Sequence, residues 1–259
     1  MKTGRPPLII TVDGPAASGK STAAKNLAAV LGVPYVTTGA LYRAVAWIAD
    51  RQGQSLGNAR ALARVARGLD IRFRVAGFGG TLSVLVGGRD VTRELMHPRI
   101  SHLTSAKVAF LRPVRDAVNA RTRKMAEGGR LVAEGRDCGT VVFPGAPYKF
   151  YLTASVGERA RRRRLDLARM GLRTSLASIR RDLAGRDRTD AGRGYGALAV
   201  PADAWVVDNT GFEPAETVAS LVRRLDTRGL ISRRRFGRML PEVIRRALGG
   251  PVCRASGNP

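Results

Sequence analysis

The residues with the clearest chemical meaning form the stretch "GPAASGKST", which fits the pattern GxxxxGK[ST] at every position from Gly14 to Ser21. Two glycines let backbone N–H groups turn inward and approach an oxyanion closely. Lys20 can reach the β- and γ-phosphates of a nucleotide, and the Ser21 hydroxyl can bind Mg²⁺. The residues predicted to hold a triphosphate are Gly14, Pro15, Ala16, Ala17, Ser18, Gly19, Lys20, Ser21 and Thr22.

The elements around this stretch fit the motif. A β-branched apolar run, Leu8–Val12, predicts a strand buried on both faces, which is typical of a parallel sheet. Apolar spacing predicts a helix from Gly19 to Leu31, ended by Gly32 and Pro34. The positive end of that helix would point at the phosphates.

A phosphate-binding loop does not by itself choose between a switch, a motor, a kinase and a transporter ATPase. The chain has no NKxD-type guanine signature and no LSGGQ-like segment, which disfavours a GTPase and a transporter. A GxGxx[GA] match at Gly192–Ala197 has no strand before it, so it does not predict a dinucleotide site. A kinase would need a second anion site for its acceptor.

Three segments are candidates for that second site, because arginine pairs bidentately with phosphate oxygens. They are "TTGALYR" (Thr37–Arg43), "EGRDCGT" (Glu134–Thr140) and "GRDRTDAGR" (Gly185–Arg193). Each alone is better explained as a turn or a solvated helix end. Their order after a phosphate loop favours a shared anion site.

Strands and helices alternate along most of the chain, which predicts an α/β fold with a parallel central sheet. Further strands are expected at 35–38, 130–137, 148–155 and 204–209, and further helices at 40–53, 112–127, 156–170, 175–187 and 214–227. Residues 70–75 and 81–86 instead predict an antiparallel hairpin, inside an inserted subdomain at about 55–110.

With these segments in this order, residues 8–225 resemble the bacterial cytidylate kinases, the CMP/dCMP kinases of the nucleoside monophosphate kinase group. The matching pieces are "TVDGPAASGKST", "TTGALYRAVA", "VAFLRPVRDAV", "VAEGRDCGTVVFPGAPYKFYLTAS", "ERARRRR", "RDRTDAGR" and "VPADAWVVDNTG". The resemblance implies a three-layer P-loop NTPase fold over 1–228, an insert that binds the nucleoside monophosphate, and a short Arg-rich lid at about 157–172. The basic extension 229–259 has no counterpart.

The resemblance also implies residue roles. CMP would be bound by Thr38, Tyr42, Arg43, Arg115, Arg136, Asp137, Arg186, Asp190 and Arg193. The lid arginines over ATP would be Arg159, Arg162 and Arg163, and the catalytic residues would be Lys20, Arg136, Arg186 and Arg193. Within the CMP group, Arg115 and Asp137 would read the cytosine edge.

The implied reaction transfers the γ-phosphoryl group of ATP to CMP or dCMP with Mg²⁺ on Ser21. Glu134 through a water, or Asp13, could orient the metal; equally, both could anchor the loop. Three positions depart from the family: Thr37 replaces an acidic residue, Ala106 stands where a base-contacting serine is usual, and Glu134 replaces a frequent Asp. Other acceptors, such as UMP, AMP or a non-nucleotide, stay open.

The formal net charge of +25 favours anionic partners, although a bias toward Arg and Ala explains the excess equally well. Nucleic acid is expected only as a secondary partner of the basic tail, because the chain lacks an RRM, KH or zinc-finger pattern and only 5% of its residues are aromatic. Cys138 and Cys253 lie far apart and form no CxxC pair, so neither a disulfide framework nor a zinc site is expected. We therefore predict that the protein is located in the reducing cytoplasm. No signal peptide or membrane segment is expected, and the predicted state is a monomer.

Overall fold

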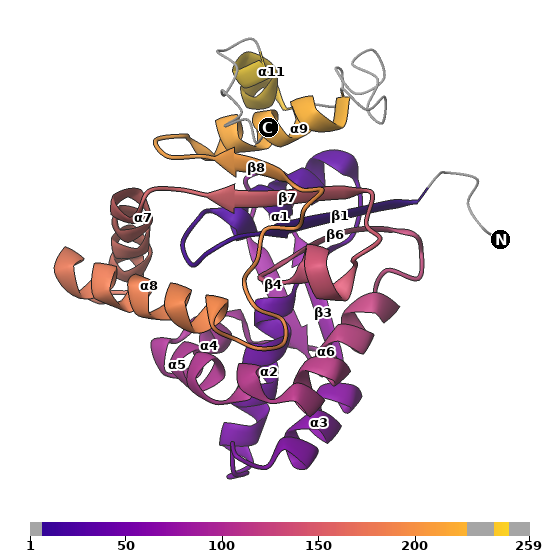
Figure 1. Ribbon diagram of the computed structural model, residues 1–259, viewed down its shortest axis with the longest axis vertical. Helices are drawn as coiled ribbons and strands as arrows, with labels where there is room; N and C mark the ends of the chain where they lie inside the picture. Colours follow the sequence, from indigo (N-terminus) through magenta and orange to yellow (C-terminus); the bar gives the residue numbers. More distant parts are fainter. Residues whose placement is uncertain (1–6, 227–240, 249–259) are drawn as a thin grey trace.

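The computed structural model describes residues 7–226 and 241–248. Its central sheet has five parallel strands in the order β2 (Tyr35–Thr37), β6 (Arg130–Gly135), β1 (Leu8–Asp13), β7 (Tyr148–Thr153) and β8 (Trp205–Asp208). In Figure 1 the strands end on the side where α7 (Val156–Arg169) and α8 (Leu176–Ala191) lie. That edge carries the predicted phosphate loop, as expected for ligand sites in parallel sheets.

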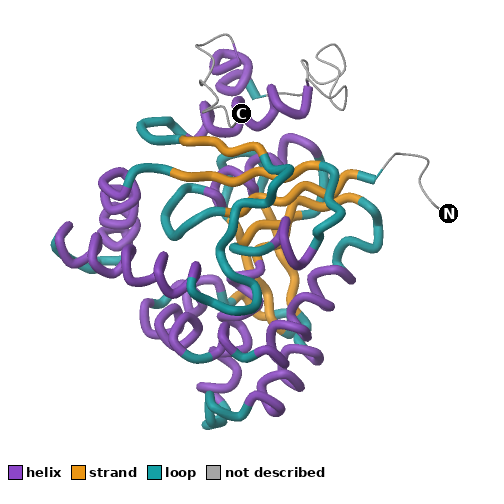
Figure 2. The backbone as a smooth tube through the Cα atoms, viewed as in Figure 1, coloured by secondary structure: helices purple, strands orange, loops and turns teal. Residues whose placement is uncertain are grey.

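Helices cover both faces of the sheet, so the predicted three-layer α/β fold is confirmed (Figure 2). On one face, Ile10, Val12 and Phe150 pack with α1 (Lys20–Leu31) and α9 (Pro214–Asp226). On the other face, α2 (Thr38–Arg51) and α6 (Arg112–Lys124) pack on Leu131 and Ala133. Burial on both faces explains why the strands are continuous apolar runs.

The segment between α2 and α6 holds the predicted antiparallel hairpin. Strands β3 (Ile71–Val75) and β4 (Leu82–Val86) pair in antiparallel register, and a short β5 (Arg89–Asp90) adds a third strand. Three helices that the sequence analysis did not identify surround it: α3 (Ala59–Gly68), α4 (Thr92–Met96) and α5 (Pro98–Ala106). A 3₁₀ turn, Val108–Phe110, then leads into α6.

The tip of this hairpin touches the helix that follows the phosphate loop. Lys25 of α1 donates to the Gly80 carbonyl, and the Asn26 side chain accepts from the Gly79 N–H at 3.0 Å. The Phe73 ring also meets Tyr35 edge-on, with centroids 6.3 Å apart. The inserted segment is therefore attached to the core by polar and aromatic contacts as well as by its helices.

Helix α8 is longer than predicted. We expected its end at Asp187, but the helix continues to Ala191 and ends at Gly192. The polar run after Gly185 contains no residue that breaks a helix before Gly192. As a consequence, Arg186 and Asp190 lie on one helix, one turn apart, and Arg193 follows directly.

Part of the C-terminal extension is a short helix, α11 (Glu242–Leu248), packed on α9 (Figure 1). Ile244 is fully buried in the same core as α1 and α9, with Ala247 and Leu248 beside it. The sequence spacing predicts that Val243 shares an apolar face with Ile244, Ala247 and Leu248, but Val243 is 46% exposed. The rest of the predicted tail, 229–240 and 249–259, lies outside the described residues. None of the described helices is long and apolar enough to cross a bilayer.

These neighbours on α11 make a matched stability test. We expect Ile244→Ala to lower the free energy of unfolding by about 2 kcal/mol, because it empties a buried site on α9. Val243→Ala should change it by less than about 0.5 kcal/mol, because that side chain faces solvent. Urea unfolding of the full-length variants measures both values. Equal effects would show that α11 does not contribute to the core through Ile244.

Candidate active site

The phosphate loop connects β1 to α1 in a conformation suited to an anion. Gly14 (φ 152°), Ala17 (φ 59°) and Gly19 (φ 85°) have positive φ, and within residues 7–226 and 241–248 Ala17 is the only non-glycine with this feature. A Cβ on Gly14 would lie 2.1 Å from the Leu152 carbonyl oxygen of β7, so only glycine fits there. Such left-handed backbone turns N–H groups toward one point, which creates an anion-binding concavity.

Lys20 lies inside this loop and is almost fully buried. Its Nζ donates to the Pro15 carbonyl at 3.1 Å. Burial is the main cause that lowers the pKa of Lys20 to about 7, and the nearby Arg136 guanidinium contributes to this shift. A bound phosphate would favour the charged form, so Lys20 is suited to a polyanionic ligand.

The first residues of α1 contact the end of β6. The Ser21 hydroxyl donates to Oε1 of buried Glu134 at 3.0 Å, and Tyr35 OH lies 3.5 Å from the same oxygen. Thr38 at the start of α2 donates to the Glu134 carbonyl. A hydroxyl and a carboxylate thus meet beside Lys20, and both are oxygen ligands of the kind that Mg²⁺ prefers.

Asp13, the other candidate for the metal, has a different set of contacts. Its two carboxylate oxygens accept from the N–H groups of Cys138 and Gly139, at 2.9 and 2.7 Å. Burial raises the pKa of Asp13 to about 6, and these N–H bonds oppose the rise. This arrangement supports the anchoring alternative for Asp13: it fixes the turn Cys138–Val142 that follows β6.

The predicted acceptor-phosphate residues meet around one carboxylate. Arg136 Nε donates to Asp190 Oδ2 at 2.7 Å, and Arg193 Nη2 donates to Asp190 Oδ1 at 2.6 Å. Burial lowers the pKa of Arg186, and Arg163 and Arg136 lower it further by charge repulsion. Arginines from α7, from α8 and from the position directly after β6 therefore lie close together, and such a cluster attracts an anion.

The predicted base-reading pair is buried and bonded to itself. Arg115 Nη2 donates to Asp137 Oδ2 at 2.5 Å, and the exposed fractions are 1% and 3%. Arg115 Nη1 donates to the Ala109 carbonyl at 3.0 Å, and the Tyr42 ring centroid lies 5.5 Å from the guanidinium. Burial raises the pKa of Asp137, while the Arg115 charge opposes that rise.

The Ser105 hydroxyl, one position before Ala106, does not bond Arg115 or Asp137. Ser105 Oγ instead donates to the carbonyls of Ser101 and His102 within its own helix. Ala106 itself is exposed at the end of α5.

The predicted lid arginines of α7 contact the backbone of the phosphate loop. Arg159 Nη1 donates to the Ala16 carbonyl at 3.2 Å and to Asp187 of α8 at 2.7 Å. Arg162 Nη1 donates to the Ser18 carbonyl at 3.2 Å. Arg163 is partly exposed and faces Arg186. Residues of α7 therefore support the loop from outside.

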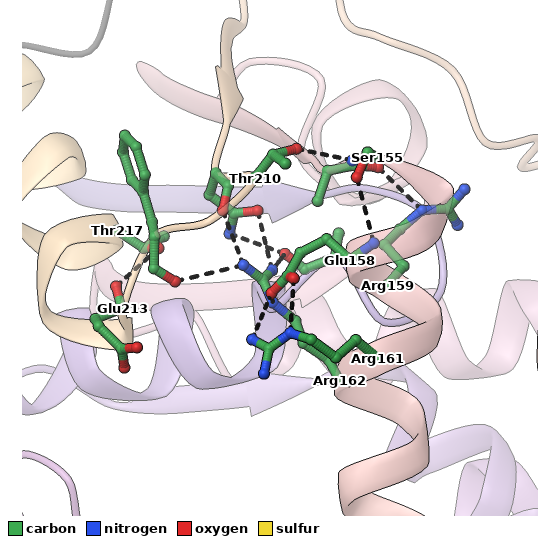
Figure 3. A network of polar contacts seen from close by, with 12 residues as sticks. Ser155, Glu158, Arg159, Arg161, Arg162, Thr210, Glu213 and Thr217 are labelled. Carbon is green, nitrogen blue, oxygen red and sulfur yellow. Dashed lines mark hydrogen bonds and ion pairs between the residues drawn. The ribbon is translucent and has the colours of Figure 1, made fainter. Parts of the chain in front are cut away.

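Asn209, which the sequence analysis missed, completes this support. Its Nδ2 donates to the Ser18 carbonyl at 2.9 Å, and its Oδ1 and carbonyl oxygen accept from Arg162 at 3.1 and 2.8 Å. Figure 3 shows Glu158 and Arg162 on α7 facing the segment after β8 that carries Thr210. Asn209 follows the last strand at the ligand edge of the sheet, and this position was the available signal.

Several buried polar atoms around the site have no partner within the described residues. They are Ser18 Oγ, Tyr42 OH, Arg43 Nε, Arg115 Nε and Arg193 Nε. Unpaired buried groups are rare in native proteins, and their concentration here is typical of a site for a polar ligand. Arg43, one turn into α2, also lies beside Glu134 and Arg136.

Comparison with known proteins gives consistent matches. A family model described as cytidylate kinase matches residues 10–227. A cytidylate kinase of Geobacter sulfurreducens is 42% identical over 223 residues, covering 85% of this chain and 94% of that protein. One of Pelotomaculum thermopropionicum is 41% identical over 216 residues, covering 83% and 95%. A gluconokinase structure from Sinorhizobium meliloti covers 87% of this chain and 97% of its own, at 16% identity and a TM-score of 0.42, which supports no further conclusion.

Adjacent arginines of α7 test the support of the phosphate loop. We expect Arg162→Ala to lower the free energy of unfolding by about 2–3 kcal/mol, because it leaves buried carbonyls of Ser18 and Asn209 with fewer donors. Arg161→Ala is the control, since Arg161 is 55% exposed and pairs with Glu158. It should change stability by less than about 0.5 kcal/mol.

Two measurements decide this prediction: thermal unfolding and nucleotide binding by calorimetry. Arg162→Ala should also weaken binding of ATP by about tenfold, because the loop backbone loses its fixed shape. Matching results for the two variants would contradict the role given to Arg162.

Proposed function

This chain belongs to the cytidylate kinase family and is a phosphotransferase that acts on CMP with ATP; we propose that it does so through the cations gathered at the ligand edge of the sheet. The observation that carries the proposal is the proximity of Lys20, in the donor loop, to Arg136 and Asp190 of the predicted acceptor site. Donor and acceptor phosphates held there would lie next to each other.

On the donor side, we propose that residues 14–22 bind the phosphates of ATP. The positive φ angles of this loop and the buried Lys20 support that role. Arg159 and Arg162 hold the loop carbonyls, so the N–H groups stay directed at the ligand. Arg163 is free to turn toward ATP, because it lies partly exposed beside Arg186.

On the acceptor side, we propose that Arg43, Arg136 and Arg193 hold the CMP phosphate. Arg136 and Arg193 now share Asp190, and a phosphate dianion would be a stronger partner for both. Asp190 would then be free to accept from a sugar hydroxyl. Arg186, between the two sets of phosphates, would stabilise charge on the group in transfer.

Mg²⁺ is proposed as the cofactor, with Ser21 as its ligand and with Glu134 holding it through a water. The oxygen donors of these two side chains fit the ion, and Mg²⁺ commonly takes its other ligands from substrate phosphates and water. Among the described residues, no cluster of three or more His, Cys, Asp or Glu that could hold a metal ion is present. When bound, the ion would neutralise charge on the phosphates.

The chemistry requires little of the protein beyond positioning and charge. The CMP phosphate is already an anion, so it can attack without a strong general base. Lys20 and the arginines would align the two phosphates and offset the negative charge that the substrates bring together. Closure of α7 over the site would exclude water, which otherwise competes as acceptor.

Selectivity is proposed to come from Asp137 and Arg115. A buried carboxylate can accept from the exocyclic amine of cytosine, whereas uracil presents a carbonyl at that position. Such a mismatch leaves buried polar groups unpaired. Both CMP and dCMP fit this proposal, because the base contacts do not involve the sugar.

Cytoplasmic location and a monomeric state are further proposals. Cys138 is a buried free thiol, which agrees with a reducing compartment. Nucleic-acid binding by residues 229–259 stays a prediction, since only 241–248 of that extension are described.

The acceptor assignment predicts a ranking of substrates. ADP release with saturating ATP should be fastest with CMP and dCMP, and about 100-fold lower in kcat/KM with UMP, because uracil would turn a carbonyl oxygen toward the Asp137 carboxylate. AMP should be poorer still. A clear preference for UMP or AMP would overturn the acceptor assignment.

The assignment of Lys20 to the ATP-binding loop predicts how turnover changes when its positive charge is removed. Lys20→Met should lower kcat by about 10²–10³-fold, because Lys20 would stabilise charge on the transferred group. Lys124→Met removes the same charge from an exposed position on α6 and should keep wild-type kinetics within about twofold. Circular dichroism confirms folding, and near-wild-type turnover by Lys20→Met would contradict the donor site.

A further inference from the structure

The base-reading pair is held from one side by two residues of a short loop, and the proposed function uses neither of them. This loop follows α8 and contains Tyr195 and Gly196, in the GxGxx[GA] stretch that lacks a preceding strand. Arg115 Nη2, which binds Asp137, also donates to the Gly196 carbonyl at 3.3 Å. The guanidinium that would meet cytosine thus has a third partner, beside Asp137 and Ala109, from a different part of the chain.

Gly196 also limits the space around the pair. It is buried, with φ at 68°. A Cβ at this position would lie 1.9 Å from Arg115 Nη2 and 2.5 Å from Asp137 Oδ2. No side chain fits there without displacing both members of the pair, so the backbone at residue 196 determines where they lie.

Tyr195 adds an aromatic wall. Its ring centroid lies 3.6 Å from the Arg112 guanidinium and 5.7 Å from that of Arg115. Its hydroxyl accepts from Asn119 at 3.5 Å. With Tyr42 at 5.5 Å, the Arg115 guanidinium lies close to two tyrosine rings, each of which favours a cation near its face.

The loop is also attached to the acceptor-phosphate site. It begins at Arg193, which binds Asp190, and the Leu198 N–H donates to the Asp190 carbonyl at 2.8 Å. Tyr195 and Gly196 are therefore fixed relative to the end of α8. The same short segment connects the residue proposed for the acceptor phosphate to the pair proposed for the base.

We propose that Tyr195 and Gly196 are positioning residues for base selection: they set the place of Arg115 and Asp137 and thereby contribute to the preference for a cytosine nucleotide. This inference rests on the proposed function, because it assumes that the pair reads the base. It adds a determinant outside the pair itself, supplied by the end of α8.

The two loop glycines give a matched test. Gly196→Ala should raise KM for CMP about tenfold and reduce the preference for CMP over UMP about tenfold, because the pair moves from its place. KM for ATP and kcat at saturating CMP should stay within about threefold, since the donor loop is untouched. Gly194→Ala is the control: it is exposed, has no atoms within 4 Å of its Cβ, and should match the wild type.

A second pair of variants, at Tyr195, tests the same role in case Gly196→Ala fails to fold. Tyr195→Leu removes the ring and should raise KM for CMP about fivefold, whereas Tyr195→Phe keeps the ring and should restore most of the affinity. Thermal unfolding is measured for every variant. A purely structural role would lower stability and kcat without changing the ratio of CMP to UMP.

The outcomes separate this inference from the proposed function. Wild-type enzyme without a preference for CMP, or Arg115→Met with the preference intact, would overturn the base-reading assignment and with it this inference. Loss of preference in Arg115→Met, with unchanged ratios in Gly196→Ala and Tyr195→Leu, would overturn only the positioning role. A reduced preference for CMP over UMP in all three variants supports the positioning role of Tyr195 and Gly196.

Discussion

The site depends on positive charges that lie close together, with Lys20 and Arg193 buried and Arg136 and Arg186 partly buried. Lys20, Arg136, Arg186 and Arg193 gather there, and Asp190 is shared by two of them. Burial and mutual repulsion lower the pKa of Lys20 and of Arg186. The arrangement therefore lowers the stability of the empty protein, and a bound polyphosphate would offset part of that loss. This cluster of positive charges supplies the electrostatic attraction for two anionic substrates.

The parallel sheet makes such an arrangement feasible. The ends of β1, β6 and β8 meet at one edge, so Asp13, Glu134 and Asn209 lie near the same loop. The three side chains act on different partners, because Asp13 fixes the turn after β6, Glu134 holds Ser21, and Asn209 holds the loop carbonyl of Ser18. Polar groups that look alike in the sequence are thus divided between support of the backbone and contact with a ligand.

Much of this could be predicted from the sequence. Apolar runs identified every strand of the central sheet, and glycine and lysine spacing identified the donor loop. Arg136, Asp190 and Arg193 were placed in one site by the resemblance, and the structure brings them together. Other features could not be predicted, because their signal is not local. The end of α8 was placed too early, since a polar run looks the same on a helix and in a loop. The support from Asn209 and the restriction at Gly196 depend on packing between distant segments.

The contacts of the Ser18 carbonyl have a consequence for how the molecule assembles. The donor loop is a compact run of residues. The side chains that bond its Ser18 carbonyl, Arg162 and Asn209, lie 144 and 191 positions further along the chain. Closing such long loops costs entropy and delays folding. A growing chain therefore carries its most recognisable motif from the beginning, yet holds it in a fixed shape only after the last strand of the sheet has been made. In time, the first functional segment to be synthesised is among the last to become organised.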